Sequence, residues 1–242
     1  MSNEYVKREY RKYMKADDLI GFPVKIRESD LFILAEKKLQ KEAKEILEYY
    51  REQLEEYIRL DLLFYITLEP YKVLPSAPSI VKEMAYWAGR VGVGPMAGVA
   101  GAIAEFVGKD LLKYTSQVII ENGGDIFLST KKERKVAIFA GKSPWSNKLG
   151  ILIPQNSTLG ICTSSATVGP SLSFGNADAV VIVSESAILS DTLATAVGNM
   201  IQKPEDINLG IEFAKGFPEV HEVIIIMGKY LGIWGRYEII NL

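Results

Sequence analysis

Two oxygen-bearing side chains, Asp191 and Thr195, lie four residues apart in the segment "SDTLATAVGN". In an α-helix this spacing places both side chains on one side, and Asn199 extends that side by another turn. A carboxylate and a hydroxyl one turn apart are hard oxygen ligands, which suit Mg²⁺ together with waters and substrate phosphates. The alternative interpretation is that Ser190 or Asp191 only caps the start of this helix.

Two further segments combine glycine with polar side chains. Residues 121–125, "ENGGD", place an amide and two carboxylates around a glycine pair, but Asn-Gly between apolar runs is also the signal of a β-hairpin. Residues 162–170, "CTSSATVGP", follow an apolar strand-like run. Such segments can line phosphate or ribose sites, and many are only connections, so the residues alone leave both interpretations open.

The chain has one cysteine, Cys162, and one histidine, His221. A multi-histidine metal site and an intramolecular disulfide are therefore excluded. No neighbour in the sequence would lower the thiol pKa of Cys162, so a buried, unreactive thiol is favoured over a nucleophile. His221 begins an apolar run and is interpreted as a strand-entry residue.

Small residues recur every three or four positions between residues 94 and 108, at Gly94, Gly98, Gly101, Ala104 and Gly108. Pro95 suits the first position of a helix there, because its missing N–H would be unpaired anyway. Glycine inside a helix costs about 0.5–1 kcal/mol relative to alanine, so the stripe needs a compensating role. One interpretation is a tightly packed central helix, and the other is a helix whose N-terminus also faces an anionic ligand.

The elements that must position these residues follow a repeated order. Residues 22–130 indicate strand, strand, helices, strand, strand, and residues 131–242 repeat that order loosely. Pairs of strands dominate over alternating strand–helix units, which predicts an α+β fold with antiparallel sheets. We expect one domain over residues 1–242, with approximate halves 15–130 and 131–242.

Composition limits the function further. The 242 residues carry a formal net charge of −2 and no basic block with interleaved aromatics, which excludes a typical nucleic-acid partner. The longest uncharged apolar run is shorter than the ~20 residues that span a bilayer. The charged N-terminus does not resemble a signal peptide, so we expect a cytoplasmic protein without a membrane partner.

Taken together, these segments resemble the ApbE-like superfamily, whose best-known members are Mg²⁺-dependent FAD:protein FMN transferases. Four pieces match in order: an alanine–glycine helix, a strand–NGG–strand element, the turn "TSS" where the family has Thr-Ser-Gly, and "SDTLATAVGN". The closest similarity is to a small uncharacterised branch with the hallmark "VGPMAxVAGAIAE" followed by "ENGGDIF", here residues 93–105 and 121–127. The resemblance implies an α+β fold of two related ββααββ modules (T-fold-like) with a central small-residue helix.

The resemblance also implies a site that holds Mg²⁺ and FAD or a related flavin. Its metal ligands would be Asp191, Thr195 and the backbone carbonyl of Ala104. Its flavin-nucleotide pocket would be lined by Gly94, Asn122, Gly123, Gly124, Asp125, Thr163, Ser164 and Ser165.

Two departures from the transferases oppose flavin transfer but not a retained pocket. The transferases have lysine where this chain has Glu105, and they carry a His-x-x-Asp-Pro-x-Thr-Gly segment that residues 166–189 lack. The leading hypothesis is a Mg²⁺-assisted pocket for a flavin or another phosphate-bearing small molecule. One alternative is a non-catalytic or sulfur-handling partner protein, for sulfur-containing amino-acid synthesis, that uses Cys162 or protein contacts. Another is a homo-oligomer whose contacts use the small-residue helix.

Overall fold

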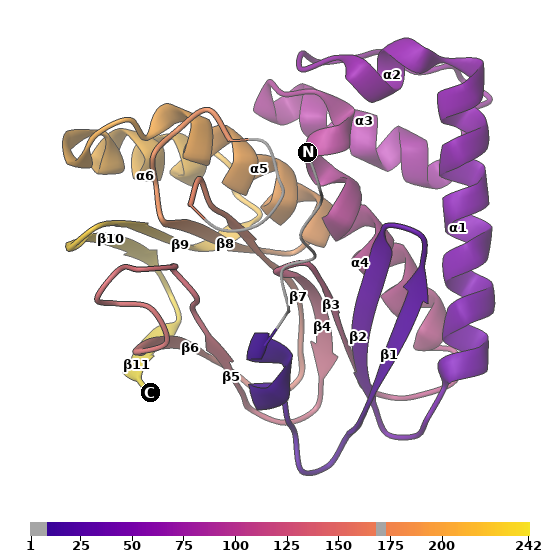
Figure 1. Cartoon of the computed structure of the whole chain (residues 1–242), viewed down its shortest axis with the longest axis horizontal. Helices are drawn as coiled ribbons and strands as arrows, with labels where there is room; N and C mark the ends of the chain where they lie inside the picture. The colour runs from indigo at the N-terminus through magenta and orange to yellow at the C-terminus, as the bar shows by residue number, and fades with distance from the viewer. Residues whose placement is uncertain (1–8, 168–172) are drawn as a thin grey trace.

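Eight strands form one fully antiparallel sheet in the computed structural model, which describes residues 9–167 and 173–242 (Figure 1). The order β1-β2-β3-β4-β7-β8-β9-β10 gives each half of the chain four neighbouring strands, which meet at the β4–β7 pair. The strands are β1 (Ile20–Ile26), β2 (Ser29–Ala35), β3 (Val118–Asn122), β4 (Asp125–Thr130), β7 (Ser157–Ser164), β8 (Ala179–Ser184), β9 (Val220–Met227) and β10 (Tyr230–Gly235). This arrangement confirms the α+β class and the antiparallel sheets.

The hairpin between β3 and β4 is the turn that Asn-Gly predicts. Asn122 pairs with Asp125, and the two residues between them, Gly123 and Gly124, have φ angles of 74° and 110°. L-residues with side chains rarely adopt such angles, so two glycines are required here. The turn therefore fixes Asn122 and Asp125 at one end of the sheet.

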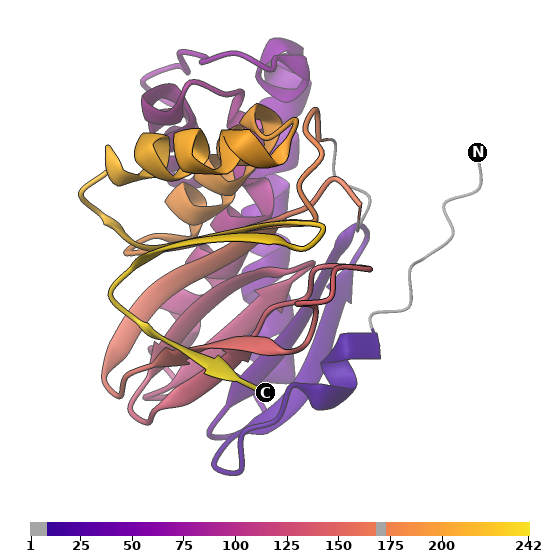
Figure 2. The same ribbon diagram turned by 90° about the vertical axis from the view of Figure 1, so that its left-hand side faces the viewer.

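The helices cover one face of this sheet (Figures 1 and 2). They are α1 (Gln40–Leu60), α2 (Leu62–Ile66), α3 (Ser79–Val91), α4 (Val99–Leu111), α5 (Ala187–Met200) and α6 (Ile207–Lys215), with 3₁₀ turns η2 (Pro95–Gly98) and η3 (Pro204–Asp206). The 3₁₀ turn η1 (Glu9–Tyr13) instead lies on the other face of the sheet. One apolar core packs α1, α3 and α4 on the first four strands, and a second packs α5 and α6 on β8 and β9. In the described part of the chain, no single helix is long and apolar enough to cross a membrane, although α3 and η2–α4, bent by 108°, satisfy that test as a pair.

A second, three-stranded sheet lies on the opposite face of the main sheet, in the order β11-β6-β5 (Figure 2). Its strands are β5 (Arg134–Ala137), β6 (Leu149–Ile153) and β11 (Glu238–Asn241), and a third apolar core fills the space between the sheets. The first two strands of the second half of the chain, β5 and β6, therefore belong to this sheet and not to the main one. The second module begins its four main-sheet strands at β7.

The small-residue stripe serves contacts within the chain. A Cβ atom at Gly101 would lie 2.2 Å from the carbonyl oxygen of Ala187, so only glycine lets α4 approach the start of α5 this closely. At Gly108, a Cβ atom would lie 2.2 Å from the ring of Phe127 in β4. The packed-helix interpretation is thus confirmed. The alternative that this stripe forms oligomer contacts gains no support, because its glycines already face other parts of the same chain.

Candidate functional site

The site centres on Asp191, where α4 and α5 meet. Helix α5 begins at Ala187 and is capped by Ser186, whose side chain accepts backbone N–H groups of the first turn. Asp191 therefore lies in the second turn, and the interpretation that it caps its own helix is wrong. Instead, its Oδ2 accepts the backbone N–H of Gly101 at 2.8 Å, so Asp191 is held at the first turn of α4.

A second carboxylate, Asp125, approaches Asp191 from the start of β4. Asp125 Oδ1 accepts the backbone N–H of Thr163 at 3.3 Å, which links β4 to β7 beside the site. Burial and the Asp125 carboxylate raise the pKa of Asp191 well above its usual range. The opposing influences are the backbone N–H groups of Gly101 and Ala100, and no cationic side chain is among them. Two neighbouring acids in a buried place favour a proton or a cation between them.

The two predicted turns border this acid pair. Asn122 donates its side-chain N–H to the carbonyl of Ala100 at 3.1 Å, which ties the NGG turn to the start of α4. On the β7 side, a Cβ atom at Gly198 of α5 would lie 3.3 Å from the Ser164 hydroxyl, so Ser164 faces α5. Gly198 is one helical turn beyond Thr195, which is half-buried. The structure therefore brings Asn122, Gly124, Asp125, Thr163 and Asp191 close together, with Ser164 beside α5. A place for Thr195 and Gly123 in the same site stays a prediction.

The rim of the site continues along the segment after β7. Ser165 follows the strand directly, and the rest of the candidate loop at residues 168–170 lies outside the described residues. Asn199, on the same side of α5, accepts the backbone N–H of Phe174 at 2.9 Å. The Asn199 side chain thus holds the segment at Phe174, which leads toward β8.

Two predicted residues lack a recorded contact with this group. A Cβ atom at Gly94 would lie 2.0 Å from the carbonyl oxygen of Thr67, so packing against that segment accounts for this glycine. Ala104 lies one turn beyond Gly101 within α4, and helical geometry directs its carbonyl along the helix toward Gly108. A metal contact from Ala104 stays a prediction.

Glu105 is a structural residue that sequence reasoning did not place. It is 3% exposed, and its Oε2 accepts the Ser186 hydroxyl at 2.8 Å and the Ile188 N–H at 3.2 Å. Its other oxygen pairs with Lys109 at 2.5 Å. The carboxylate thus stabilises the N-terminus of α5, where negative charge is favourable. The only sequence signal was the Glu105–Lys109 spacing of four residues.

A second acid pair lies on the other face of the sheet. Arg11 joins Glu121 and Asp30, with N–O distances of 2.6 Å to each. Glu121 also accepts the N–H of Gly124 at 2.9 Å, which supports the NGG turn from behind. The sequence could not predict this contact, because 110 residues separate Arg11 from Glu121.

The oxygen atoms of the acid pair suit Mg²⁺ better than they suit a metal whose ligands are all protein side chains. Apart from residues 1–8 and 168–172, the chain gathers no three His, Cys, Asp or Glu side chains able to hold a metal. Mg²⁺ usually binds one or two carboxylates and completes its shell with waters and phosphate oxygens. The carboxylates of Asp191 and Asp125 are oxygen donors of that kind. A metal contact from the Thr195 hydroxyl stays a prediction.

Cys162 and His221 are a buried thiol and a residue at the start of a strand, as the sequence favoured. Cys162 is fully buried, and its thiol donates to the carbonyl of Ala187 at 3.3 Å. Burial, with the charges of Asp125 and Asp191, raises the pKa of this thiol well above its usual value. His221 is the second residue of β9, and its Nδ1 lies 3.2 Å from the Tyr237 hydroxyl.

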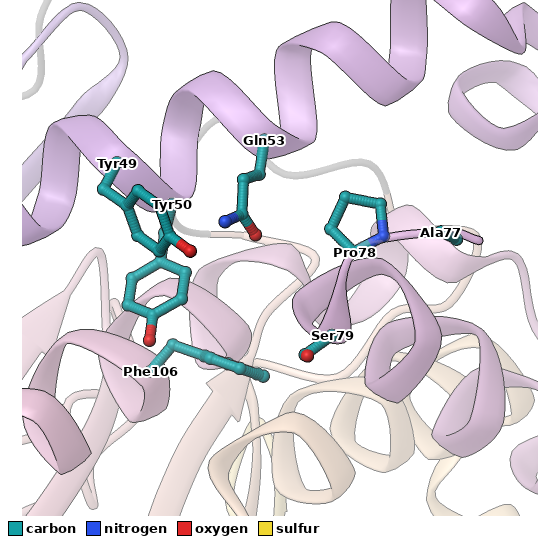
Figure 3. A pocket seen from close by; sticks show the side chains of 7 residues that line it. All are labelled: Tyr49, Tyr50, Gln53, Ala77, Pro78, Ser79 and Phe106. Atoms are coloured by element: carbon teal, nitrogen blue, oxygen red, sulfur yellow. The ribbon is translucent and has the colours of Figure 1, made fainter.

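A separate hollow of about 420 Å³ lies between α1, α4 and the start of α3 (Figure 3). It is lined by Tyr49, Tyr50, Gln53, Ala77, Pro78, Ser79 and Phe106. The Tyr50 hydroxyl already donates to Asp110 at 2.8 Å, and no acidic side chain lines the hollow. We therefore place the candidate chemistry at the acid pair and not in this cavity.

The fold is similar to those of solved flavin transferases. The flavinyl transferase ApbE of Pseudomonas stutzeri, in its apo form, aligns with a TM-score of 0.56 at 12% identity, covering 92% of this chain and 95% of that one. The flavin transferase ApbE of Vibrio cholerae gives a TM-score of 0.53 at 12% identity, covering 90% of this chain and 96% of that one. At this identity the likeness concerns the fold, which is ApbE-like.

Sequence comparison gives the family. The family model described as "AbpE bacteria" matches residues 11–213. The UPF0280 protein of Methanosarcina barkeri is 37% identical over 228 residues, covering 91% of this chain and 90% of the relative. The UPF0280 protein of Methanococcus aeolicus is 44% identical over 179 residues, covering 72% of each. The chain therefore belongs to the AbpE bacteria family and to the ApbE-like superfamily.

Proposed function

We propose that this chain binds a flavin nucleotide, or another small molecule bearing phosphate, together with Mg²⁺ where α4 and α5 meet. The observation that carries the proposal is the convergence of Asp125 and Asp191 beside the NGG turn, with Thr195 one helical turn away. The names of the ApbE neighbours support a flavin as the ligand.

In this proposal each residue has a defined task. The Gly101 N–H fixes the orientation of the Asp191 carboxylate, which would hold the metal with Thr195 and Asp125. Asn122, Gly123 and Gly124 would border the nucleotide on one side, and Thr163, Ser164 and Ser165 on the other. When bound, Mg²⁺ would supply positive charge to phosphate oxygens that otherwise face two carboxylates.

The proposal stops at binding and does not include flavin transfer. Glu105 stands where the transferases resembled by this sequence have lysine, and it is committed to capping α5. The histidine-containing segment of those transferases is also missing from residues 166–189. A sulfur-handling role gains no support either, because Cys162 is buried and its raised thiol pKa disfavours the reactive thiolate.

The test begins with protein purified without added cofactor. Small molecules released on denaturation are identified by absorbance and mass spectrometry, and the native protein is then titrated with FAD in the presence of Mg²⁺ or of EDTA. We expect FAD to bind with Mg²⁺ and to bind at least about tenfold more weakly without it, as expected for loss of a metal that neutralises phosphate.

Riboflavin is the matched control ligand, because it keeps the isoalloxazine ring and lacks phosphate. Its binding should be weak and independent of Mg²⁺. Equal affinity for FAD with and without Mg²⁺ would remove the metal from the proposal. Absence of both released flavin and FAD binding would overturn the flavin proposal itself.

A further inference from the structure

The segment around α2 presents an apolar face that the fold does not cover. Six large apolar residues between positions 60 and 68 are 51–71% exposed: Leu60, Leu62, Leu63, Tyr65, Ile66 and Leu68. The segment lies at the end of the molecule farthest from the three-stranded sheet, beyond α3 (Figure 1). Single exposed leucines are ordinary, but a contiguous set of this kind marks an interaction surface.

Helical geometry places these side chains on one outward face. Successive residues of a helix are separated by about 100°, and Phe64, the middle residue of α2, points inward and is fully buried. Leu62, Leu63, Tyr65 and Ile66 therefore spread over the arc opposite Phe64. We call these four residues, with Leu60 and Leu68, the α2 face.

The α2 face is held firmly from beneath. The rings of Phe64 and Tyr57 meet edge to face, with centroids 5.3 Å apart. Tyr71 donates its hydroxyl to Asp61 at 3.0 Å, and the Tyr57 hydroxyl accepts the Leu74 N–H at 3.1 Å. Such anchors fix the backbone before any partner arrives, which lowers the entropic cost of binding.

We propose that the α2 face is the contact surface between two copies of this chain. With about 200 Å² for a fully exposed large residue, exposed fractions of 51–71% give the six residues roughly 700 Å² of surface. This area exceeds the largest apolar patch of a typical monomer, about 300–600 Å². It is close to the ~800 Å² that each partner buries in a stable interface of standard size.

The charges on this segment favour a second copy over other occupants. Residues 60–74 contain only Asp61, Glu69 and Lys72 as charged side chains. An anionic bilayer or a nucleic acid would require an excess of lysine and arginine. An apolar face needs no complementary charge on its partner, and two copies related by a two-fold axis match each other by symmetry.

The first test is the solution mass of the full chain, measured by light scattering at several micromolar concentrations. We expect twice the chain mass of 26.9 kDa for the wild type and a single chain mass for the double variant Leu63→Glu, Ile66→Glu. Leu209→Glu on α6, where the leucine is 59% exposed, is the matched control and should remain dimeric. A monomeric wild type, or a dimer that survives the double variant, would overturn the proposal.

A second test does not depend on the double variant and therefore still tests the proposal if that variant fails to fold. Cys162 is buried, so Leu62→Cys introduces a single accessible thiol. A short bis-maleimide should couple two Leu62→Cys chains at least about tenfold faster than two Leu209→Cys chains, because only the α2 faces are held together in the dimer. Equal coupling rates would contradict the proposed surface. A wild type that is monomeric and instead floats with phosphatidylcholine vesicles would assign the α2 face to lipid and overturn the dimer.

Discussion

Two pairs of acids lie on opposite faces of the main sheet, next to the same β3–β4 turn. They differ in whether a cationic side chain of the protein bonds them. Burial and a neighbouring acid raise the pKa of Asp30 as well as that of Asp191. The difference is the cation: Arg11 bonds both Asp30 and Glu121, whereas only backbone N–H groups lower the pKa of Asp191. Adjacent residues of β3 separate the faces, since Glu121 reaches Arg11 and Asn122 reaches α4. Where the chain supplies the cation, the pair is structural. At Asp191, the proposed function takes the cation from solution.

The largest effect on stability is expected from a side chain at Gly101, where α4 approaches α5 closely enough to bond Asp191. Gly101→Ala places a Cβ atom 2.2 Å from a backbone oxygen, so one helix must move, and we expect a loss of about 3 kcal/mol in the free energy of unfolding. Gly89→Ala in α3 is the control, because nothing lies within 4 Å of its Cβ position. It should stabilise by about 0.5–1 kcal/mol. Urea unfolding measures both, and equal effects would contradict the close-approach argument.

Removing the arginine should convert the structural acid pair into an uncompensated one. Arg11→Ala leaves Asp30 and the nearly fully buried Glu121 without their shared cation, and we expect a destabilisation of about 2–3 kcal/mol. The control Arg27→Ala breaks an exposed pair with Glu55 and should change stability by less than about 0.5 kcal/mol. Thermal unfolding compares them. If Arg11→Ala proves as mild as its control, the pair does not stabilise the fold.

A third buried acid, Glu222 in β9, extends the comparison to the second half of the main sheet. Burial raises the pKa of Glu222 to about 7, and its Oε1 has no hydrogen-bond partner within the described residues. The folded chain therefore retains this proton between about pH 4.5 and 7 while the unfolded chain loses it, so stability falls as pH rises through that interval.

Glu222→Gln should remove this dependence. We expect a gain of about 1–2 kcal/mol at about pH 8 and none at about pH 4, since the glutamate is largely protonated in both states at the lower pH. Urea unfolding at the two pH values measures the gain, with the exposed Glu238→Gln as control. A gain that does not depend on pH would show that Glu222 is not protonated in the native state near neutrality.

The sequence predicted local structure well and tertiary partners poorly. The order of strands and helices in residues 22–130 follows from apolar spacing, and the NGG hairpin follows from the φ angles that glycine permits. The separate sheet formed by β5, β6 and β11 could not be predicted, because apolar alternation does not specify which strand a segment pairs with. Contacts between distant segments are equally invisible to local patterns. The sequence therefore left open whether Asp191 caps its own helix, whereas the structure shows that it bonds the Gly101 N–H of α4. The contact of Glu105 with Ser186 was missed for the same reason.

The most direct test of the account compares one acid from each pair. Asp191→Asn and Asp30→Asn are both conservative changes, and the new amide oxygen in the Asp191→Asn variant can still accept the Gly101 N–H. FAD affinity is measured for each with Mg²⁺ and with EDTA. The account predicts that Asp191→Asn loses the dependence on Mg²⁺ and that Asp30→Asn keeps the wild-type dependence. Loss in both variants, or in Asp30→Asn alone, would contradict the assignment of the cation to the helix-facing pair.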